Sequence, residues 1–326
     1  MTFKYNQMII QSMRHWDKAT HSIYGSLLDS VKCDAGAPAS GSIVRSTSKG
    51  HVYLQHRVTY EGKQISLNTS RNAHRDGWSE RSRLISTLLA FGVNAPDRAA
   101  AKTLELLDAI GCFSAQKAVL IGSHAFNAIG NNLGVTWDAG FETKDIDLGR
   151  MIRVSCQPSN RTADVLLKAG FREVFSLNHK HPATTFVHTN GMKVDFLTPM
   201  TGKPTGEPEM LHGAGVHAEP LRFLDYLIKD PQEAVAMTRN GILVSVPQSA
   251  RYALHKCIIY QYRTNDVKRA KDILQAESIL TVLDESMPHL IANAWAELPW
   301  KEKAMQGMRN FRDVELAGRI EEIISG

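Results

Sequence analysis

The first third of the chain carries two kinds of hydrophobic pattern. Apolar residues recur at helical spacing over residues 5–31, which predicts an amphipathic helix that ends near Lys32. A stripe of this kind is typical of a helix face packed on a core. Residues 52–60 and 64–68 flank Glu61-Gly62-Lys63 and are rich in β-branched and aromatic residues. They therefore predict a β-hairpin.

A basic segment separates this hairpin from two more predicted helices, over residues 79–91 and 97–110. Its cationic residues, which surround Trp78, are Arg71, His74, Arg75, Arg81 and Arg83. Two interpretations stay open for this cluster. It is either a surface that binds RNA or a basic loop exposed to solvent.

The middle of the chain alternates short strands with helices, a pattern typical of a small mixed sheet. An apolar run over residues 117–121 is bounded by turn residues and predicts a buried strand. Residues 184–188 and 192–197 flank Asn190-Gly191, which is a strong hairpin signal. The other elements expected here are a helix over 162–169, a strand over 171–176 and a Gly- and Pro-rich loop over 201–220.

Beyond residue 220 the pattern becomes largely helical, with one strand expected over 242–246. Helices are predicted from Pro247 to about Arg263 and from Asn265 to about Leu283. A helical tail follows, with Trp295, Trp300 and Phe311 as packing anchors. The whole pattern predicts an α+β fold. Its expected parts are an N-terminal helix and hairpin region over 1–95, a small mixed-sheet core over 96–219 and a helical C-terminal domain over 220–326.

A glycine–serine turn follows the strand predicted at residues 117–121. Gly122 lets the backbone approach a ligand closely, and Ser123 can cap the helix that runs from His124 to about Ile129. Free N–H groups at a helix start favour a phosphate. Because Gly-Ser is also common before ordinary helices, the turn gains weight only from the acidic residues that come after it.

Two carboxylates share one side of the next predicted strand. Side chains alternate along Asp145-Ile146-Asp147, so both acids face the same way. Two like charges at such a short distance repel each other unless a cation lies between them. Asp195 points away from its apolar neighbours Val194 and Phe196, which suits the same face of an adjacent strand. Three carboxylates of this kind suit magnesium; the alternative is a strand face that carries its acids into solvent.

The order Gly-Ser, Asp-x-Asp and then a lone strand Asp is similar to that of the DNA polymerase β-like nucleotidyltransferase superfamily. A second block, Arg251-Tyr252-Ala253-Leu254-His255-Lys256 and then Lys268-Arg269-Ala270-Lys271-Asp272, resembles the bacterial AbiEii-type nucleotidyltransferases. Several of those proteins are toxins of toxin–antitoxin pairs. The resemblance covers roughly residues 115–285. The segment between Ser123 and Asp145 is longer than is usual there, and its residues 131–140 are interpreted as a substrate loop.

The resemblance implies metal-ligand roles for the three carboxylates. Asp145 and Asp147 would hold two magnesium (or manganese) ions that bridge the nucleotide phosphates and the attacking oxygen. Asp195 would complete one metal site and act as general base on the acceptor hydroxyl.

The resemblance also implies how the nucleotide is held. Gly122 and Ser123 would bind the triphosphate, while Lys256 and Arg251 would neutralise phosphate charge. Asp272, together with Lys256, would complete the catalytic set. For Lys256 and Asp272 the alternative is a surface salt bridge between neighbouring helices, which contributes little to stability.

The implied reaction transfers a nucleoside monophosphate from a nucleoside triphosphate to a hydroxyl, and pyrophosphate leaves. The toxin resemblance points to tRNA or another RNA as acceptor and to a cognate antitoxin protein as partner. A protein side chain or a small molecule such as an antibiotic is an alternative acceptor. A catalytically silent nucleotide- or RNA-binding module is the alternative class of function, which the complete set of acids disfavours.

Composition indicates the class of protein and its location in the cell but does not identify a substrate. The 326 residues are 43% hydrophobic and 22% charged, which is ordinary for a globular protein. The net charge of +5 is compatible with an anionic partner but is too small to argue for one. The first residues lack an apolar secretory core, and no apolar stretch approaches membrane-spanning length. We therefore expect a cytoplasmic protein with no membrane partner.

The cysteines and histidines add no metal site. Cys33, Cys112, Cys156 and Cys257 are scattered, which indicates neither a disulfide framework nor a zinc site. The spacing of His179, His181 and His188 is poor for ligation and no carboxylates are interleaved with them. The carboxylates thus remain the predicted metal ligands.

Overall fold

The computed structural model describes residues 13–34, 38–48, 50–69, 77–137, 145–149, 162–175, 181–202 and 207–325. In the N-terminal part the elements are β1 (Arg14–His15), α1 (Lys18–Cys33), β2 (Ser42–Ser48), β3 (His51–Tyr60), β4 (Lys63–Asn68), α2 (Trp78–Ala90) and α3 (Arg98–Ile110). The middle part contains β5 (Val119–Ile121), α4 (Gly122–Leu133), β6 (Val135–Thr136), β7 (Asp145–Gly149), α5 (Thr162–Ala169), β8 (Arg172–Val174), β9 (Thr185–Val187), β10 (Lys193–Pro199), β11 (Glu209–Leu211) and β12 (Val216–Leu221). The last part contains α6 (Leu224–Leu227), β13 (Gln232–Ala236), β14 (Ile242–Val246), α7 (Ser249–Ile259), a 3₁₀ turn (Tyr260–Tyr262), α8 (Asp266–Ser286), α9 (Pro288–Ala296), α10 (Lys301–Met308) and α11 (Val314–Ser325).

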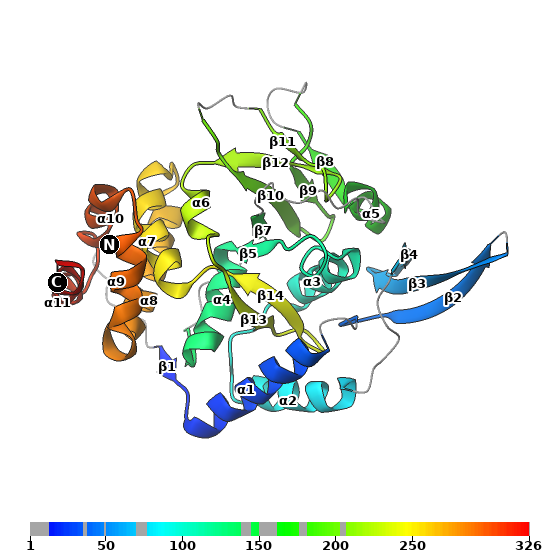
Figure 1. Ribbon diagram of the computed structural model, residues 1–326, viewed down its shortest axis with the longest axis horizontal. Helices are drawn as coiled ribbons and strands as arrows, with labels where there is room; N and C mark the ends of the chain where they lie inside the picture. Colours follow the sequence, from blue (N-terminus) through cyan, green and yellow to red (C-terminus); the bar gives the residue numbers. More distant parts are fainter. Residues whose placement is uncertain are drawn as a thin grey trace, which may run out of the picture.

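A nine-stranded mixed sheet lies at the centre of the molecule (Figure 1). Its main path is β11-β12-β10-β7-β5-β14-β13, and β9 and β8 extend it from β10. β10 runs parallel to both β7 and β12, whereas β5 runs antiparallel to β7 and parallel to β14. Strands from both sides of residue 220 therefore build one sheet. The mixed α and β content agrees with the predicted α+β class.

A large core joins the sheet to the helices around it, and a smaller core seals the edge at β13. The small core consists of Trp16, Tyr24, Leu27, Val31, Leu84, Ile85, Leu88, Val93, Val235 and Met237. α1 and α2 lie side by side against β13 and β14 (Figure 1). The Tyr24 hydroxyl donates to Oδ1 of Asn132 (2.7 Å) and accepts from the N–H of Val235 (3.3 Å). These bonds tie the N-terminal helices to α4 and the sheet.

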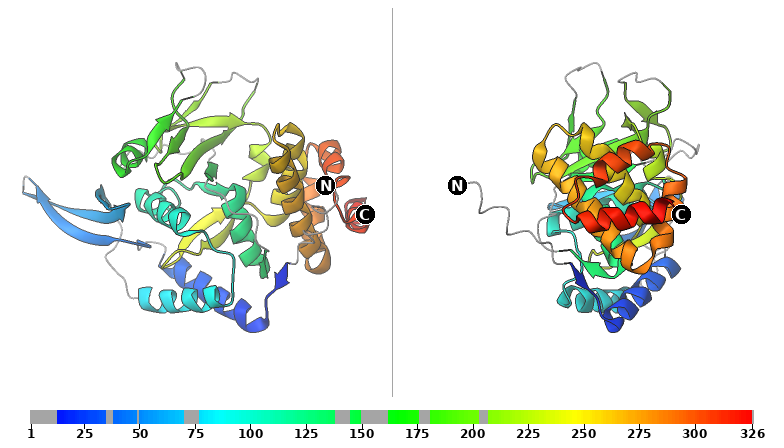
Figure 2. Two further views of the ribbon diagram at one scale, coloured as in Figure 1. Left: turned by 180° about the vertical axis from the view of Figure 1, so that it is seen from behind. Right: turned by 90° about the vertical axis from the view of Figure 1, so that its left-hand side faces the viewer.

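A second sheet of three strands, β2-β3-β4, forms an arm that extends away from the body in both views (Figure 1; Figure 2, left). Its base is anchored by Tyr60, which is buried and whose hydroxyl lies 3.0 Å from that of Thr103 on α3. The predicted hairpin over 52–60 and 64–68 is confirmed as β3 and β4. The third strand, β2, was not expected.

Several predicted elements are confirmed with small shifts at their ends. α2 and α3 match the two helices expected after the basic segment, and Asp97 caps α3 by accepting from the N–H of Ala100 (2.8 Å). β9 and β10 form the hairpin around Asn190-Gly191. The helical tail is confirmed as α9, α10 and α11, which gather at the end of the molecule away from the arm (Figure 2). Trp295 and Phe311 are buried within it.

Other expectations are wrong. The N-terminal helix begins at Lys18, where Asp17 caps it, because residues 14–15 instead form β1 beside β6; residues 1–12 lie outside the described part of the chain. Residues 201–220 contain the β11–β12 hairpin rather than one loop. The region beyond 220 holds β13 as well as β14, which pair antiparallel. These strands are stabilised by partners distant in sequence that a local pattern does not reveal.

The interpretation of residues 131–140 as a substrate loop is also wrong where the chain is described. Asn131 to Leu133 complete α4, and Gly134 ends it in the left-handed region. The Trp137 ring is buried and stacks on Phe126 with centroids 4.5 Å apart. The remainder of this segment, residues 138–140, lies outside the described ranges.

The basic segment serves the fold where it is described. Arg81 is buried and its guanidinium contacts Asp34 at 3.3 Å, while Arg83 is exposed and pairs with Glu80 on the same helix. Arg71, His74 and Arg75 lie outside the described residues. No helix in the described ranges is both long enough and apolar enough to cross a membrane.

Candidate active site

A cavity of about 560 Å³ opens between the central sheet and helices α7 and α8. Five of the residues predicted to carry the chemistry line it, although they come from four different elements. These residues are Gly122, Ser123, Asp195, Lys256 and Asp272. The fold thus brings together in one cavity residues up to 150 positions apart.

The start of α4 forms one wall of this cavity. Gly122 follows β5 directly and has φ of +70°, a conformation that glycine adopts without the steric cost of a Cβ. Its carbonyl oxygen accepts a hydrogen bond from the hydroxyl of Tyr252 on α7 (2.9 Å). The first N–H groups of a helix have no intrahelical acceptor, so this wall favours an anion.

The predicted carboxylates meet on adjacent strands. In the parallel register of β10 and β7, Asp195 stands opposite Asp147 and Lys193 opposite Asp145. On the other side of β7, Asp147 is opposite Ile121, the residue before Gly122. The side chains of Asp145 and Asp147 lie outside what the structure describes. Their strand positions nevertheless place them beside Asp195 and the start of α4.

The Asp195 carboxylate is buried and doubly hydrogen-bonded. Its Oδ1 accepts from the hydroxyl of Thr185 on β9 (2.5 Å), and its Oδ2 accepts from the ammonium of Lys193 (2.5 Å). Lys193 is two residues away on the same strand, so both side chains lie on one face of β10. Thr185 and Lys193 therefore hold the Asp195 carboxylate in place, next to the positive charge of the lysine.

On the opposite wall one carboxylate lies between two cations. Lys256 Nζ is 2.5 Å from Oδ1 of Asp272, and Arg263 Nε is 2.8 Å from its Oδ2. Lys256 and Asp272 are only 7% and 3% exposed, so the pair is not the surface salt bridge that stood as the alternative. Burial alone would raise the pKa of the Asp272 carboxyl, but Lys256 and Arg263 hold it below its ordinary value.

The cavity carries more positive charge than the sequence analysis assigned to it. Six cationic side chains line its described wall against two carboxylates, Asp195 and Asp272. Those that were not predicted are Lys193, Arg222, Arg263, Lys268 and Lys271. Lys268 and Lys271 are three residues apart on α8, which places them on one helix face with Asp272 close by. That spacing is the signal that could have identified them.

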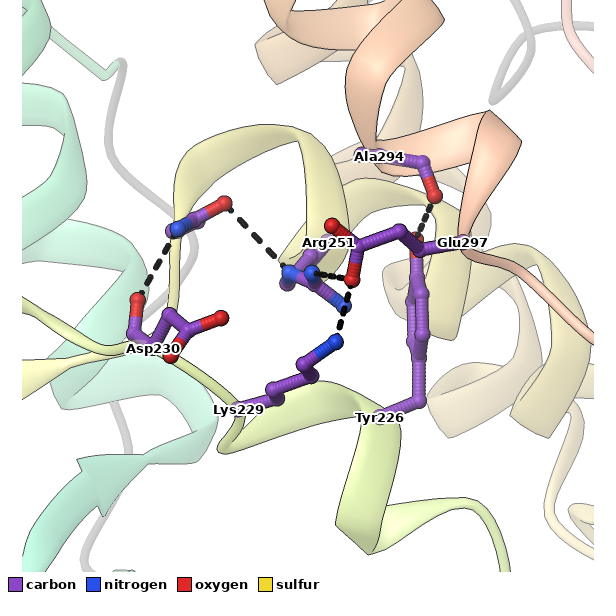
Figure 3. Close-up of polar contacts among 7 residues, drawn as sticks. Tyr226, Lys229, Asp230, Arg251, Ala294 and Glu297 are labelled. Atoms are coloured by element: carbon purple, nitrogen blue, oxygen red, sulfur yellow. Dashed lines mark hydrogen bonds and ion pairs between the residues drawn. The ribbon is translucent and has the colours of Figure 1, made fainter.

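Arg251 does not line the cavity, in contrast to its predicted nucleotide-binding role. Figure 3 shows its guanidinium directed at Glu297, which follows α9 and also accepts from Lys229. Arg251 is buried and lies over the Tyr226 ring, 4.9 Å from its centroid. The hydrogen bonds from Lys229 and Arg251 lower the pKa of Glu297 to about 2. Arg251 thus joins α7 to α6 and α9.

The histidines and cysteines form no metal site in the described part of the chain. Among the described side chains, no group of three or more His, Cys, Asp or Glu is placed to hold a metal ion. His188 is buried and its Nδ1 accepts from the N–H of Asn190 (3.2 Å). Cys33, Cys112 and Cys257 are not in disulfide bonds; Cys156 and His179 lie outside the described ranges.

Comparison with known proteins gives one match. The family model described as Nucleotidyltransferase matches residues 98–301, which is more than half of the chain and contains every described residue of the cavity wall. Neither the curated proteins nor the solved structures contain a significant match. The matched span begins after α2, so the N-terminal helices and the arm lie outside it.

Proposed function

The chain belongs to this Nucleotidyltransferase family, and we propose that its cavity transfers a nucleoside monophosphate from a nucleoside triphosphate to a hydroxyl acceptor. The observation that carries the proposal is the meeting of the α4 start, Asp195 and the Lys256–Asp272–Arg263 group in one cavity. Pyrophosphate is the leaving group. These residues supply an anion site, a base and a cluster of positive charge.

The phosphates bind where the positive potential is highest. Gly122 and Ser123, at the start of α4, line the cavity together with Lys256 of α7. Asp272 neutralises only one of its two cationic partners, so the group retains net positive charge. In a partly enclosed cavity such charge stabilises both the bound triphosphate and the charge that develops on the leaving pyrophosphate.

Asp145, Asp147 and Asp195 have the donor chemistry for magnesium or manganese. All three offer hard carboxylate oxygens, and Asp147 and Asp195 stand opposite each other on adjacent strands. A divalent ion held there would neutralise phosphate charge and orient the triphosphate. Magnesium is thus the cofactor we propose.

Asp195 is the proposed general base. The acceptor hydroxyl loses its proton to the Asp195 carboxylate as its oxygen bonds to the α-phosphorus, and the bond from that phosphorus to the bridging oxygen breaks. Thr185 fixes the carboxylate by donating to Oδ1. Asp272 acts by positioning Lys256 rather than by touching the reacting atoms.

For the acceptor we propose tRNA or another RNA, in line with the likeness of the Lys256 and Asp272 block to the AbiEii-type enzymes. The structure adds one supporting observation, because the buried Lys256–Asp272 pair lines the cavity. A toxin role, with an antitoxin partner in the cytoplasm, follows as the biological setting of this proposal. Expression of the wild-type chain would then arrest growth.

The proposal is tested with purified protein, magnesium, each of four α-labelled nucleoside triphosphates and total bacterial RNA. Label should enter RNA with the wild type, and Asp195→Asn should lower the rate by about 10²–10⁴-fold, the range for loss of a general base. Asp164→Asn, at an exposed position of α5, is the matched control and should keep full activity.

Other results would change the assignment. Label in the protein band, or transfer only to an added small molecule, would replace RNA as acceptor. Nucleotide binding with no transfer to any acceptor would indicate a silent binding module. Full activity in a variant that combines Asp145→Ala and Asp147→Ala would remove the metal assignment.

A further inference from the structure

Two of the aromatic side chains that line the cavity are each next in the chain to a lining arginine. Phe223, which precedes α6, and Tyr262, at the end of the 3₁₀ turn after α7, have ring centroids 5.5 Å apart, and both line the cavity. Trp300 packs edge-on against Phe223 from outside, with centroids 4.6 Å apart. Tyr262 is 53% exposed, an unusual amount for an aromatic side chain beside a cavity. Lys303 Nζ lies over this ring, 5.5 Å from its centroid, and more than half of the Tyr262 surface stays exposed.

The backbone at Phe223 supports a functional interpretation. Phe223 has φ of +67°, in the left-handed region that bulky side chains rarely adopt. Strain of this kind persists where the surrounding structure demands a particular side-chain placement. Here the strained residue turns the chain between β12 and α6 and holds its ring against Tyr262.

His255 also lines the cavity, directly before Lys256 in the chain. Ile259, at the end of α7, and Tyr262, in the 3₁₀ turn, follow it at helical spacing. The ring is 7% exposed, and its Nδ1 has no hydrogen-bond partner among the described residues. Burial, with a smaller effect of Lys256, lowers the pKa of His255 to about 3, so the ring is neutral near pH 7. A buried nitrogen without a hydrogen-bond partner is costly, and a hydroxyl that reaches it from the cavity would satisfy it.

We infer that the part of the cavity lined by Phe223, Tyr262 and His255 is the nucleoside subsite. The nucleobase stacks on the Tyr262–Phe223 pair, and Nδ1 of His255 meets a ribose hydroxyl. The inference rests on the proposed function, because Lys256 and the other cations of the cavity must hold the triphosphate. It adds that the chain selects a ribonucleotide and binds its base through an aromatic face, which tolerates every base because each has a π-face.

The test compares nucleoside triphosphates with inorganic tripolyphosphate, which lacks the base and ribose. Binding is measured by calorimetry with magnesium and without acceptor. The wild type should bind a nucleoside triphosphate more tightly than tripolyphosphate. Tyr262→Ala should weaken nucleoside triphosphate binding by roughly tenfold, within the range for loss of one base–aromatic stack, and leave tripolyphosphate binding unchanged.

Three comparisons separate stacking from structural damage. Tyr262→Phe should keep wild-type affinity because it keeps the ring. Tyr53→Ala, at an exposed tyrosine on the distant arm, should change neither ligand. The wild type should bind a ribonucleoside triphosphate more tightly than its 2′- or 3′-deoxy counterpart, and His255→Gln, checked for an unchanged melting temperature, should reduce that preference.

The contrary outcomes are distinguishable. If the wild type binds neither nucleoside triphosphate nor tripolyphosphate, the proposed function itself fails. If it binds nucleoside triphosphates but Tyr262→Ala loses no affinity for them, only the subsite is wrong. If Tyr262→Ala instead raises the KM for RNA alone, the platform holds an acceptor base, which would also overturn this assignment.

Discussion

Asp272 shows how a single carboxylate can hold two cations together. It is buried beside Lys256 and Arg263 and bonds each through a different oxygen. Ionic groups removed from water are stabilised only if their partners are well placed. Because one negative charge faces two positive charges, the group is held together and retains a net positive charge. The same geometry makes the loss of Asp272 costly to stability.

Asp272→Asn is expected to lower the free energy of unfolding at neutral pH by about 3–5 kcal/mol, the range for leaving a buried charge without its partner. The folded-state pKa of Asp272 lies below its ordinary value of 3.8. Its contribution is therefore complete above that value and is lost as pH falls through the folded pKa. Urea unfolding across pH should show the gap between variant and wild type close in acid.

The control for Asp272 lies on the same helix. Asp266 begins α8 and its side chain is 95% exposed, so Asp266→Asn should leave the unfolding free energy nearly unchanged. A gap between Asp272→Asn and the wild type that stays unchanged down to the most acidic pH at which both remain folded would contradict the ionic explanation.

Gly122 is the second residue on which the site depends. Gly122→Ala places a Cβ on a backbone with φ of +70° and should cost roughly 1–2 kcal/mol of stability. It should also weaken tripolyphosphate binding, because relaxation of the strain moves the first N–H groups of α4. Gly25→Ala, inside α1 with no neighbouring atom within 4 Å of the new Cβ, should instead leave stability equal or slightly higher. Equal behaviour of the two variants in thermal unfolding would remove the strain argument.

At the scale of elements, the start of α8 connects helix capping to the site. Asn265 accepts from the N–H of Lys268 (3.0 Å) and fixes the turn that presents Lys268, Lys271 and Asp272 to the cavity. Capping side chains satisfy one of the four N–H groups that a helix start leaves free. The cap therefore acts on the electrostatics of the cavity as well as on the helix.

Asn265→Ala should cost about 1 kcal/mol of unfolding free energy and also raise the KM for nucleoside triphosphate, because the first turn of α8 frays. Asp97→Ala removes an equivalent cap from α3, away from the cavity lining, and should cost a similar amount without a kinetic effect. Unfolding curves and steady-state kinetics for both variants give the comparison. A KM change shared by both variants would show that general instability, not the α8 turn, is responsible.

Local signals were sufficient for elements with caps and turns of their own. Asp97 marked the start of α3, and Asn190-Gly191 marked the β9–β10 hairpin. β13 and β6 are defined by pairing with β14 and β1, and nothing in their own residues sets them apart. Ser123 and Lys256, which line the cavity, could be predicted because each belongs to a motif of neighbouring residues in the sequence. Lys193, Arg222 and His255 were missed because only the tertiary fold directs them to the cavity.

At the scale of the molecule, the residues that match the family model are fewer than the residues that pack into one structure. The match ends near α10 and begins at α3, whereas the packed structure extends further on both sides. α1 and α2 cover Val235 and Met237 through the small core. At the other end, Leu316 and Ile320 of α11 are fully buried, and α11 packs on α8 and α9. The parts outside the match thus complete the core beneath the cavity.

A chain shortened to residues 98–301 should therefore fail to fold cooperatively, although it contains the whole described cavity wall. It would expose the apolar surface of β13 that α1 covers, including Val235, together with the faces of α8 and α9 beneath α11. Each large apolar side chain left in water costs about 1.5–3 kcal/mol, and total stability is only about 5–15 kcal/mol. A chain that lacks only residues 46–53, a segment that includes the exposed positions Thr47 and Val52 of the arm, is the matched control and should melt near the wild-type temperature. Cooperative melting of the 98–301 chain near that temperature would instead show that the matched region is an independent domain.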